Sequence, residues 1–173
     1  ANGAGKTTAM RMFCSLSLPT AGKATVAGFD VFSQNEKIKK TIGYMSQRFS
    51  LYDDLTVYEN IQFYAGIYGM GKKQIKDKAD VILRELELVA ERNTLVSNLP
   101  LGWKQKLAFS VAIFHDPSIV FLDEPTGDLD TINTVEIMDL LLSINLEKKT
   151  TCIMVCMELR LETISTNTET CFR

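Results

Sequence analysis

Residues 118–125 read SIVFLDEP, and this stretch decides the predicted fold. Four consecutive apolar residues, 119–122, are followed by the two acids Asp123 and Glu124. An apolar run that ends in acidic residues is typical of a buried parallel strand leading into a functional site. A strand followed by an ordinary acidic turn is the alternative, and the stretch alone does not separate the two.

The segments around this strand alternate between strand and helix patterns. Apolar stretches predict strands at residues 41–47 and 150–157, and short β-type stretches within residues 18–32. Apolar residues at helical spacing predict helices at residues 6–16, 73–88, 103–115 and 134–145, and Thr56 with Glu59 has the spacing of a capping box that begins another helix. The alternation predicts an α/β fold with a mostly parallel sheet. Helices dominate between about residues 49 and 116, which predicts a helical insertion in the α/β core.

Composition and charge exclude several classes of protein. The 173 residues fit one domain, or one core with an insertion. With 19 basic and 21 acidic residues the net charge is −2, so we expect no general nucleic-acid-binding surface and no nucleic-acid partner. The longest apolar run has six residues, whereas a membrane-spanning helix needs about 20.

The cysteines and the single histidine do not form a metal-binding pattern. None of the four cysteines belongs to a C-x-x-C pair, and His115 is far from all of them in sequence. A zinc cluster is therefore not expected, and the cysteines are interpreted as buried or idle thiols in a reducing compartment. They are Cys14, Cys152, Cys156 and Cys171.

Residues 3–8 read GAGKTT, the second half of the P-loop pattern G-x-x-x-x-G-K-[ST]. Glycines let consecutive backbone N–H groups turn toward phosphate oxygens, and the N-terminus of the following helix adds positive potential. Lys6 can reach the β- and γ-phosphates of a nucleotide, and the Thr7 hydroxyl can bind Mg²⁺. Asp123 would hold Mg²⁺ through water, and Glu124 would polarise an attacking water. A glycine-rich turn that only begins a helix is the alternative.

Together with three further motifs, these stretches resemble the nucleotide-binding subunit of an ATP-binding-cassette (ABC) transporter over roughly residues 1–157. The motifs occur in the family's order: a Walker A loop at residues 2–8, a Q-loop glutamine at Gln47, a signature stretch LPLGWKQKL at residues 99–107, a Walker B strand at residues 119–125 and a D-loop TGDLD at residues 126–130. The resemblance implies a P-loop NTPase core with a helical subdomain insertion. It implies an incomplete core at residues 1–48 and 117–157, a helical subdomain with the signature motif at residues 49–116, and a divergent tail at residues 158–173.

The resemblance also implies ATP and Mg²⁺ as cofactors and assigns roles to individual residues. Glu124 and Gln47 are the implied catalytic residues, and Thr7, Gln47 and Asp123 are the implied Mg²⁺ ligands. The implied nucleotide contacts are Asn2, Gly3, Ala4, Gly5, Lys6, Thr7, Thr8, Asp130 of the D-loop and, across a dimer, Gly102.

Partners and location follow from the same resemblance. Two such subunits dimerise head to tail, enclose two ATP molecules and dock on a transmembrane permease subunit or domain. A cytoplasmic subunit, peripheral on the inner face of the cell membrane, is therefore expected. The LPLGW form most resembles bacterial multidrug-efflux ATPases, so the hypothesis is an ATP-hydrolysing subunit that powers an exporter of drugs or other small molecules.

Several positions depart from the family's pattern. Pro100 stands where the signature serine is expected, and proline has neither a hydroxyl nor an N–H to donate to a γ-phosphate. Leu101 replaces the next glycine, and Asp128 stands in the D-loop where a small residue is usual. The switch histidine expected just after residues 152–155 is missing, because residues 156–158 read CME.

These departures leave alternatives open. One is a degenerate or pseudo-ATPase, a regulatory module that holds nucleotide without turnover, and another is a normal gene whose reading frame shifts near Met157. A soluble cassette ATPase that acts on DNA or ribosomes is a third class. Because the chain begins inside the glycine-rich loop, we expect a fragment that lacks the first strand or strands and the C-terminal end of the fold. Such a fragment is expected to turn over ATP weakly or not at all on its own.

Overall fold

The computed structural model describes residues 5–47, 50–126 and 131–155. The chain divides into two compact units. The first comprises Ala1–Gln47 with Ser118–Arg173, and the second is Arg48–Pro117. Within the described residues, none of the helices combines the length and the apolar character that crossing a membrane requires.

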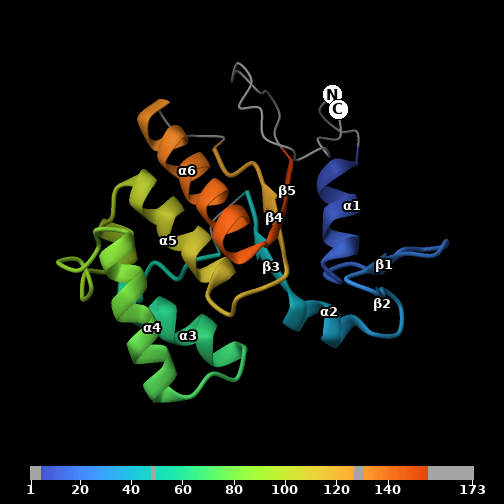
Figure 1. The fold of residues 1–173 in the computed structure, drawn as a ribbon, viewed down its shortest axis with the longest axis horizontal. Coiled ribbons are helices and arrows are strands. Elements are labelled where there is room, and N and C mark those ends of the chain that lie inside the picture. The colour runs from blue at the N-terminus through green and yellow to red at the C-terminus, as the bar shows by residue number, and fades with distance from the viewer. Residues whose placement is uncertain (1–4, 48–49, 127–130, 156–173) are drawn as a thin grey trace. The chain divides into compact units, whose positions relative to one another are not determined.

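A parallel sheet of three strands forms the centre of the first unit (Figure 1). Its order is β3 (Ile42–Met45), β4 (Ile119–Asp123) and β5 (Thr151–Val155). Ile119 lies opposite Ile42 on one side and opposite Thr151 on the other. The apolar run of β4 therefore occupies the central position, which explains why its side chains are buried, and the predicted parallel α/β fold is confirmed.

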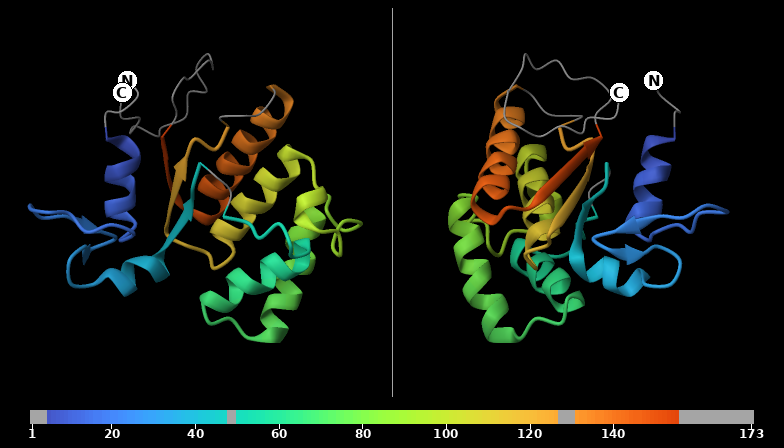
Figure 2. Two further views of the ribbon diagram at one scale, coloured as in Figure 1. Left: turned by 180° about the vertical axis from the view of Figure 1, so that it is seen from behind. Right: turned by 45° about the vertical axis from the view of Figure 1, so that its right-hand side comes forward.

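Helices of the same unit cover both faces of this sheet (Figures 1 and 2). α1 (Lys6–Phe13) lies on one face, where Met10 and Cys14 pack against Phe121 of β4. α6 (Thr131–Lys148) lies on the other face and contacts β5. Because side chains alternate along a strand, Phe121 and Asp123 point to the α1 side together.

A small antiparallel hairpin and a short helix complete the first unit. β1 (Thr25–Val26) pairs with β2 (Phe29–Asp30) through a two-residue turn. Ala27 and Gly28 in that turn have φ values of +51° and +80°, as a type I′ turn requires. α2 (Asn35–Thr41) then leads directly into β3.

The second unit is helical. It contains α3 (Val57–Ile67), α4 (Lys72–Glu85), the short 3-10 helix η1 (Val96–Asn98) and α5 (Leu101–Ile113). α3 contacts both α4 and α5. Fully or nearly fully buried side chains from these elements and from the turn after α4 form its interior: Val57, Ile61, Ala79, Leu83, Leu88, Val96, Leu107 and Phe109.

Two predicted helix ends are wrong for the same physical reason. α1 ends at Phe13 and α4 at Glu85, each about three residues before the predicted end. At each end a residue in the left-handed region, Ser15 or Glu87, reverses the chain, and the next N–H donates back to the carbonyl of the last turn. This is the Schellman arrangement, which usually uses glycine. Neither position is glycine, so the sequence carries no signal for the stop.

The prediction for the last strand is only partly correct. β5 forms at Thr151–Val155, within the predicted range 150–157, but its side chains are half-exposed, although an apolar run of this kind is typical of a buried strand. Within the described part of the sheet β5 pairs with β4 alone, so it is an edge strand.

Replacing Thr56 with alanine is expected to lower the free energy of unfolding of the second unit by about 1 kcal/mol. The capping box is complete: the Thr56 hydroxyl accepts from the N–H of Glu59, and the Glu59 carboxylate accepts from the N–H of Thr56 at 2.8 Å. Urea unfolding followed by the fluorescence of Trp103 in α5 measures the change. Thr20→Ala, at an exposed position outside any helix, is the matched control. An equal effect from both substitutions would contradict the capping role.

Candidate functional site

The predicted phosphate-binding loop meets the start of α1 at Gly5. Gly5 has φ +81°, a left-handed conformation that side-chain-bearing residues rarely adopt, and its position explains why the loop needs glycine there. The N–H of Ala9 donates to the carbonyl of Gly5 at 2.8 Å, which closes the first turn of the helix. The first turn of a helix directs backbone N–H groups and a partial positive charge toward the preceding loop. Such a helix start is suited to bind a phosphate.

Thr7 and Asp123 meet although 116 residues separate them in sequence. The Thr7 hydroxyl on α1 donates to Asp123 Oδ1 at the end of β4, at 3.2 Å. Asp123 is 2% exposed, whereas Thr7 is exposed. The pair joins the helix start to the carboxyl end of the central strand, where ligands bind in open α/β sheets.

Gln47 and Glu124 form a second contact at the carboxyl end of the sheet. Gln47 follows β3 by two residues, and its side-chain Nε2 donates to Glu124 Oε2 at 2.9 Å. Because β3 and β4 are parallel neighbours, their carboxyl ends meet at the same edge of the sheet. The contact fixes the orientation of a carboxylate that remains partly exposed, so a water molecule can reach it.

The backbone of Glu124 is strained. Its φ is +53°, in the left-handed region, at a cost of roughly 1–3 kcal/mol for a residue other than glycine. The N–H of Glu124 donates to the carbonyl of Val155 at 2.8 Å, so the end of β5 holds this turn in place. Strain of this kind is found where a side chain must be aimed at a site. Sequence reasoning missed Val155, because a backbone carbonyl on a neighbouring strand leaves no residue-type signal.

Two further side chains lie close enough to Asp123 to respond to its charge. Burial, and to a lesser extent the Asp123 carboxylate, raises the pKa of the Cys14 thiol to about 12. The same two causes raise the pKa of Tyr44 on β3 above its ordinary value. Cys14 is therefore a protonated, buried thiol, as predicted, while the position of Tyr44 beside the site was not predicted. The alternation of side chains along β3 and β4, which places Tyr44 opposite Phe121, is the signal that could have found it.

The residues at this edge of the sheet fit a magnesium ion. Mg²⁺ prefers oxygen ligands and commonly takes only one or two from the protein, with water and substrate phosphate supplying the others. Thr7 and Asp123 present a hydroxyl and a carboxylate oxygen 3.2 Å apart, near the separation of about 3 Å between neighbouring ligands in an octahedron with bonds of about 2.1 Å. In the part of the chain that the structure describes, no group of three or more His, Cys, Asp and Glu side chains could hold a metal by itself. An ion here would therefore need a bound phosphate and water molecules to supply its remaining ligands.

The remaining predicted site residues divide into three sets. Lys6 and Thr8 lie in the first turn of α1, next to Gly5 and Thr7. Gly102 is buried in the first turn of α5, which belongs to the second unit. Asn2, Gly3, Ala4 and Asp130 lie outside the described residues, so their predicted roles stay predictions.

Comparison with known proteins identifies the family. The sequence model described as ABC transporter matches residues 1–127. The chain is 40% identical over 135 residues to the probable multidrug ABC transporter ATP-binding protein YbhF of Escherichia coli, and the match covers 78% of this chain and 23% of that protein. It is 35% identical over 150 residues to the ABC transporter ATP-binding protein NatA of Bacillus subtilis, which covers 86% of this chain and 61% of that protein. This chain thus spans less than two thirds of either relative.

The fold gives an independent match. The structure resembles that of the dimeric ATP-binding cassette MJ0796 in a post-hydrolysis state bound to ADP and Pi, with a TM-score of 0.80 and 26% sequence identity. The similarity covers 92% of this chain and 72% of that one. The chain therefore belongs to the ABC transporter family.

Proposed function

We propose that the chain is the ATP-binding and ATP-hydrolysing subunit of an ABC-type membrane exporter. One observation carries this proposal: two side-chain pairs from separate segments meet at the carboxyl end of one sheet. Thr7 lies 3.2 Å from Asp123, and Gln47 lies 2.9 Å from Glu124. The first pair has the chemistry to hold a magnesium–phosphate group, and the second has the chemistry to activate water.

The start of α1 binds the phosphates in this proposal. Backbone N–H groups from the loop and the first helical turn surround the phosphate oxygens, and the Lys6 ammonium adds a charge-assisted hydrogen bond. The proposed nucleotide contacts include Asn2, Gly3 and Ala4 in the loop and Thr8 in the first turn of α1. Thr7 and Asp123 hold Mg²⁺, which when bound neutralises charge on the phosphates.

The second pair performs the chemistry. Glu124 accepts a hydrogen bond from the attacking water and takes its proton as the water oxygen bonds to the γ-phosphorus. The bond between that phosphorus and the bridging oxygen breaks, so that ADP leaves and inorganic phosphate is formed. Gln47 holds the Glu124 carboxylate in the required orientation and lies close enough to that edge of the sheet to add an amide oxygen near the metal. The strained turn at Glu124, tied to Val155, keeps the carboxylate aimed without further rearrangement.

Partners and substrate class belong to the same proposal. A second cassette would bind head to tail and present its Gly102 to the ATP held here, and Asp130 of the D-loop would be a further nucleotide contact. Residues 49–116 would form the helical subdomain that docks on a transmembrane permease. Dimeric association is supported by the similarity to the dimeric cassette MJ0796. Drugs or other small molecules as the transported class are supported by the name of the relative YbhF, a probable multidrug ABC transporter ATP-binding protein. The subunit would lie at the cytoplasmic face of the membrane.

Removing Mg²⁺ tests the proposal on the wild-type chain. Titration with a fluorescent ATP analogue should give an affinity that falls by about tenfold when excess EDTA replaces Mg²⁺. Without the metal, nothing links the phosphate oxygens to Thr7 and Asp123, and the Asp123 carboxylate repels the phosphates. Restoring Mg²⁺ should recover the affinity. AMP, which lacks the β- and γ-phosphates, is the matched control ligand and should bind weakly under both conditions. Equal affinity with and without Mg²⁺ would contradict the proposed metal site.

Chemistry is measured in the same preparation under single-turnover conditions, with the chain in excess over radiolabelled ATP. Release of phosphate from bound ATP supports an ATPase subunit. Tight Mg²⁺-dependent binding with no phosphate release at all would overturn hydrolysis and favour a pseudo-ATPase, the interpretation that Pro100 and the missing switch histidine suggest.

A further inference from the structure

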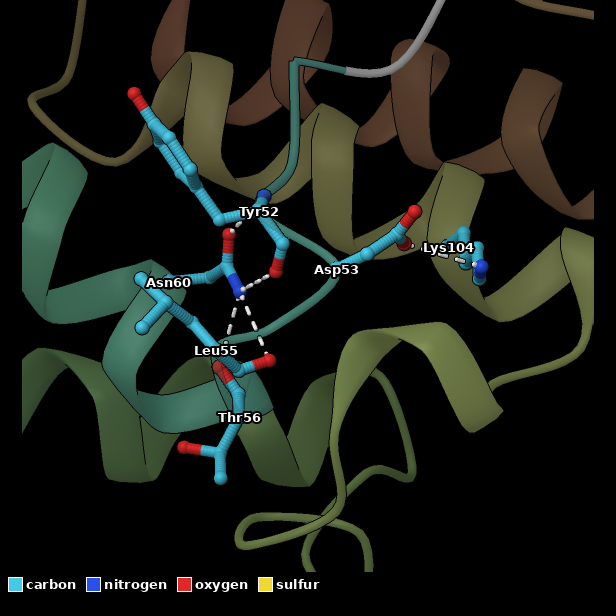
Figure 3. A network of polar contacts seen from close by, with 6 residues as sticks. All are labelled: Tyr52, Asp53, Leu55, Thr56, Asn60 and Lys104. Atoms are coloured by element: carbon cyan, nitrogen blue, oxygen red, sulfur yellow. Dashed lines mark hydrogen bonds and ion pairs between the residues drawn. The ribbon is translucent and has the colours of Figure 1, made fainter.

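A buried asparagine of α3 holds one short segment of the second unit (Figure 3). Asn60 is 0% exposed, and its side-chain amide is used on both sides. Its oxygen accepts from the N–H of Tyr52 at 2.9 Å, and its nitrogen donates to the carbonyls of Tyr52 at 3.0 Å, Thr56 at 3.1 Å and Leu55 at 3.4 Å. Asn60 thus fixes the backbone of residues 52–56, which we name the clamped segment.

The clamped segment is bound in turn to the stretch that leads into α5. The N–H of Val96 donates to the carbonyl of Leu55 at 3.0 Å, and the N–H of Ser97 donates to the carbonyl of Asp53 at 3.1 Å. Thr56 also forms a β-bridge with Leu95. Val96 and Ser97 belong to η1, and Pro100 then occupies the N-cap position of α5. Residues 99–102, named here the signature segment, therefore begin where these contacts end.

A side-chain contact adds to this link. Lys104 in the first turn of α5 donates to Asp53 Oδ1 at 3.3 Å, and Lys104 is 20% exposed (Figure 3). α5 has no acidic residue in its own first turn, and Pro100 gives no side-chain hydrogen bond to cap it. Asp53 brings a negative charge to that turn from the clamped segment, where it stabilises the helix start and offsets the Lys104 charge.

We propose that Asn60 is a positioning residue for the signature segment and acts through the clamped segment. The Asn60 amide is bonded to the backbone of Tyr52 and Leu55. The carbonyls of Leu55 and Asp53 accept from the N–H groups of Val96 and Ser97. The Asp53 carboxylate accepts from Lys104. This inference rests on the proposed function, in which the signature segment contacts ATP bound to a second copy. The residues proposed to hold ATP in the same copy, 5–8, 47 and 123–124, belong to the other unit. Loss of the Asn60 amide should therefore reduce turnover and leave ATP affinity unchanged.

Hydrogen exchange of the full chain tests the link itself. In Asn60→Ala, the exchange rates of the Val96 and Ser97 amides should rise by about tenfold or more, although these amides are bonded to Leu55 and Asp53 and not to Asn60. The amides of Leu86 and Leu88, which end α4, are bonded to Ile82 and Leu83 and should change by less than about twofold. Asn98→Ala, at an exposed asparagine of η1, is the matched control. Unchanged exchange at Val96 and Ser97, or an equal rise in α4, would overturn the proposal.

A measurement on the wild-type chain guards against a variant that fails to fold. Native-state exchange at low denaturant gives each amide an opening free energy and a denaturant slope. The same opening free energy and denaturant slope are expected for the amides of Tyr52, Val96 and Ser97, and different values are expected for the amides of α4. Opening of Tyr52 at a clearly lower free energy than Val96 and Ser97 would overturn the link.

Kinetics then tests the functional part, at a temperature where the variant is fully folded by circular dichroism. The dissociation constant of Mg-ATP should stay within about twofold in Asn60→Ala, and the single-turnover rate should fall by about tenfold. An unchanged rate would overturn the positioning role, and so would a loss of affinity equal to the loss of rate. A wild-type chain that binds no ATP would instead contradict the proposed function. The exchange data would still test whether Asn60 stabilises the backbone at Val96 and Ser97.

Discussion

ATP hydrolysis is expected to slow by about 10²–10⁴-fold in Glu124→Gln, while Mg-ATP affinity stays within about twofold. The substitution keeps the size of the side chain and can keep a hydrogen bond with Gln47, but an amide cannot take a proton from the attacking water. The backbone turn and its bond to Val155 do not involve the side chain, so the site keeps its shape. Single-turnover phosphate release and equilibrium titration with a fluorescent ATP analogue measure the two quantities.

Glu147→Gln is the control for this variant. It makes the same chemical change at an exposed position of α6 and should leave both quantities unchanged. A Glu124→Gln chain that hydrolyses ATP at the wild-type rate would assign the proton transfer to another group. A chain that loses ATP affinity instead would place Glu124 in binding rather than in chemistry.

Asp123→Asn has the second large expected effect: the gain in ATP affinity that Mg²⁺ provides should fall by about tenfold or more. The amide oxygen of asparagine can still accept from the Thr7 hydroxyl, so α1 should stay attached to β4. What is lost is the negative charge that attracts the metal. ATP affinity measured in EDTA should therefore be nearly unchanged, which separates a metal-site effect from a general loss of binding.

The same substitution should also change the pKa of the neighbouring Cys14 thiol. The Asp123 carboxylate is one of the causes that raise the pKa values of Cys14 and Tyr44. Removing it should lower the pKa of Cys14 from about 12, but not to the ordinary value, because burial is the larger cause. The rate of thiol alkylation as a function of pH measures this change. Asp139→Asn on the exposed side of α6 is the control and should change neither the pKa nor the magnesium effect.

The central strand shows why the α/β fold could be predicted from sequence. An unbroken apolar run is typical of a parallel strand that is buried on both faces, and β4 is such a strand. β5 carries a similar apolar run but is half-exposed, because burial of an edge depends on which strands lie beside it. The sequence of one strand does not contain that information. Helix starts were predicted well where a side chain caps them, as at Thr56, and helix ends poorly where Ser15 or Glu87 reverses the chain without glycine.

Some residues of the candidate site could also be predicted from sequence, and others could not. Asp123, Glu124 and the start of α1 could be located because their motifs place specific residue types at fixed offsets. Val155 and the backbone of Glu124 could not, because their contribution depends on strand register and on a dihedral angle. Asn60 was also missed, since a single asparagine in an amphipathic helix looks like any polar surface residue. Only the fold shows that it is fully buried and bonded to three carbonyls.

Metal-directed cleavage tests most directly whether Thr7 and Asp123 hold the magnesium of a bound nucleotide. Fe²⁺ replaces Mg²⁺ in the presence of ATP, and a reductant and peroxide are added, so that the chain is cleaved beside the bound metal. ATP-dependent cleavage is expected next to Thr7 and next to Asp123, the latter giving fragments of about 123 and 50 residues from the 173-residue chain. Both cuts should disappear in Asp123→Asn and remain in Asp139→Asn. Cleavage at other positions, or cleavage that does not depend on ATP and Asp123, would contradict the claim that Thr7 and Asp123 hold the magnesium of a bound nucleotide.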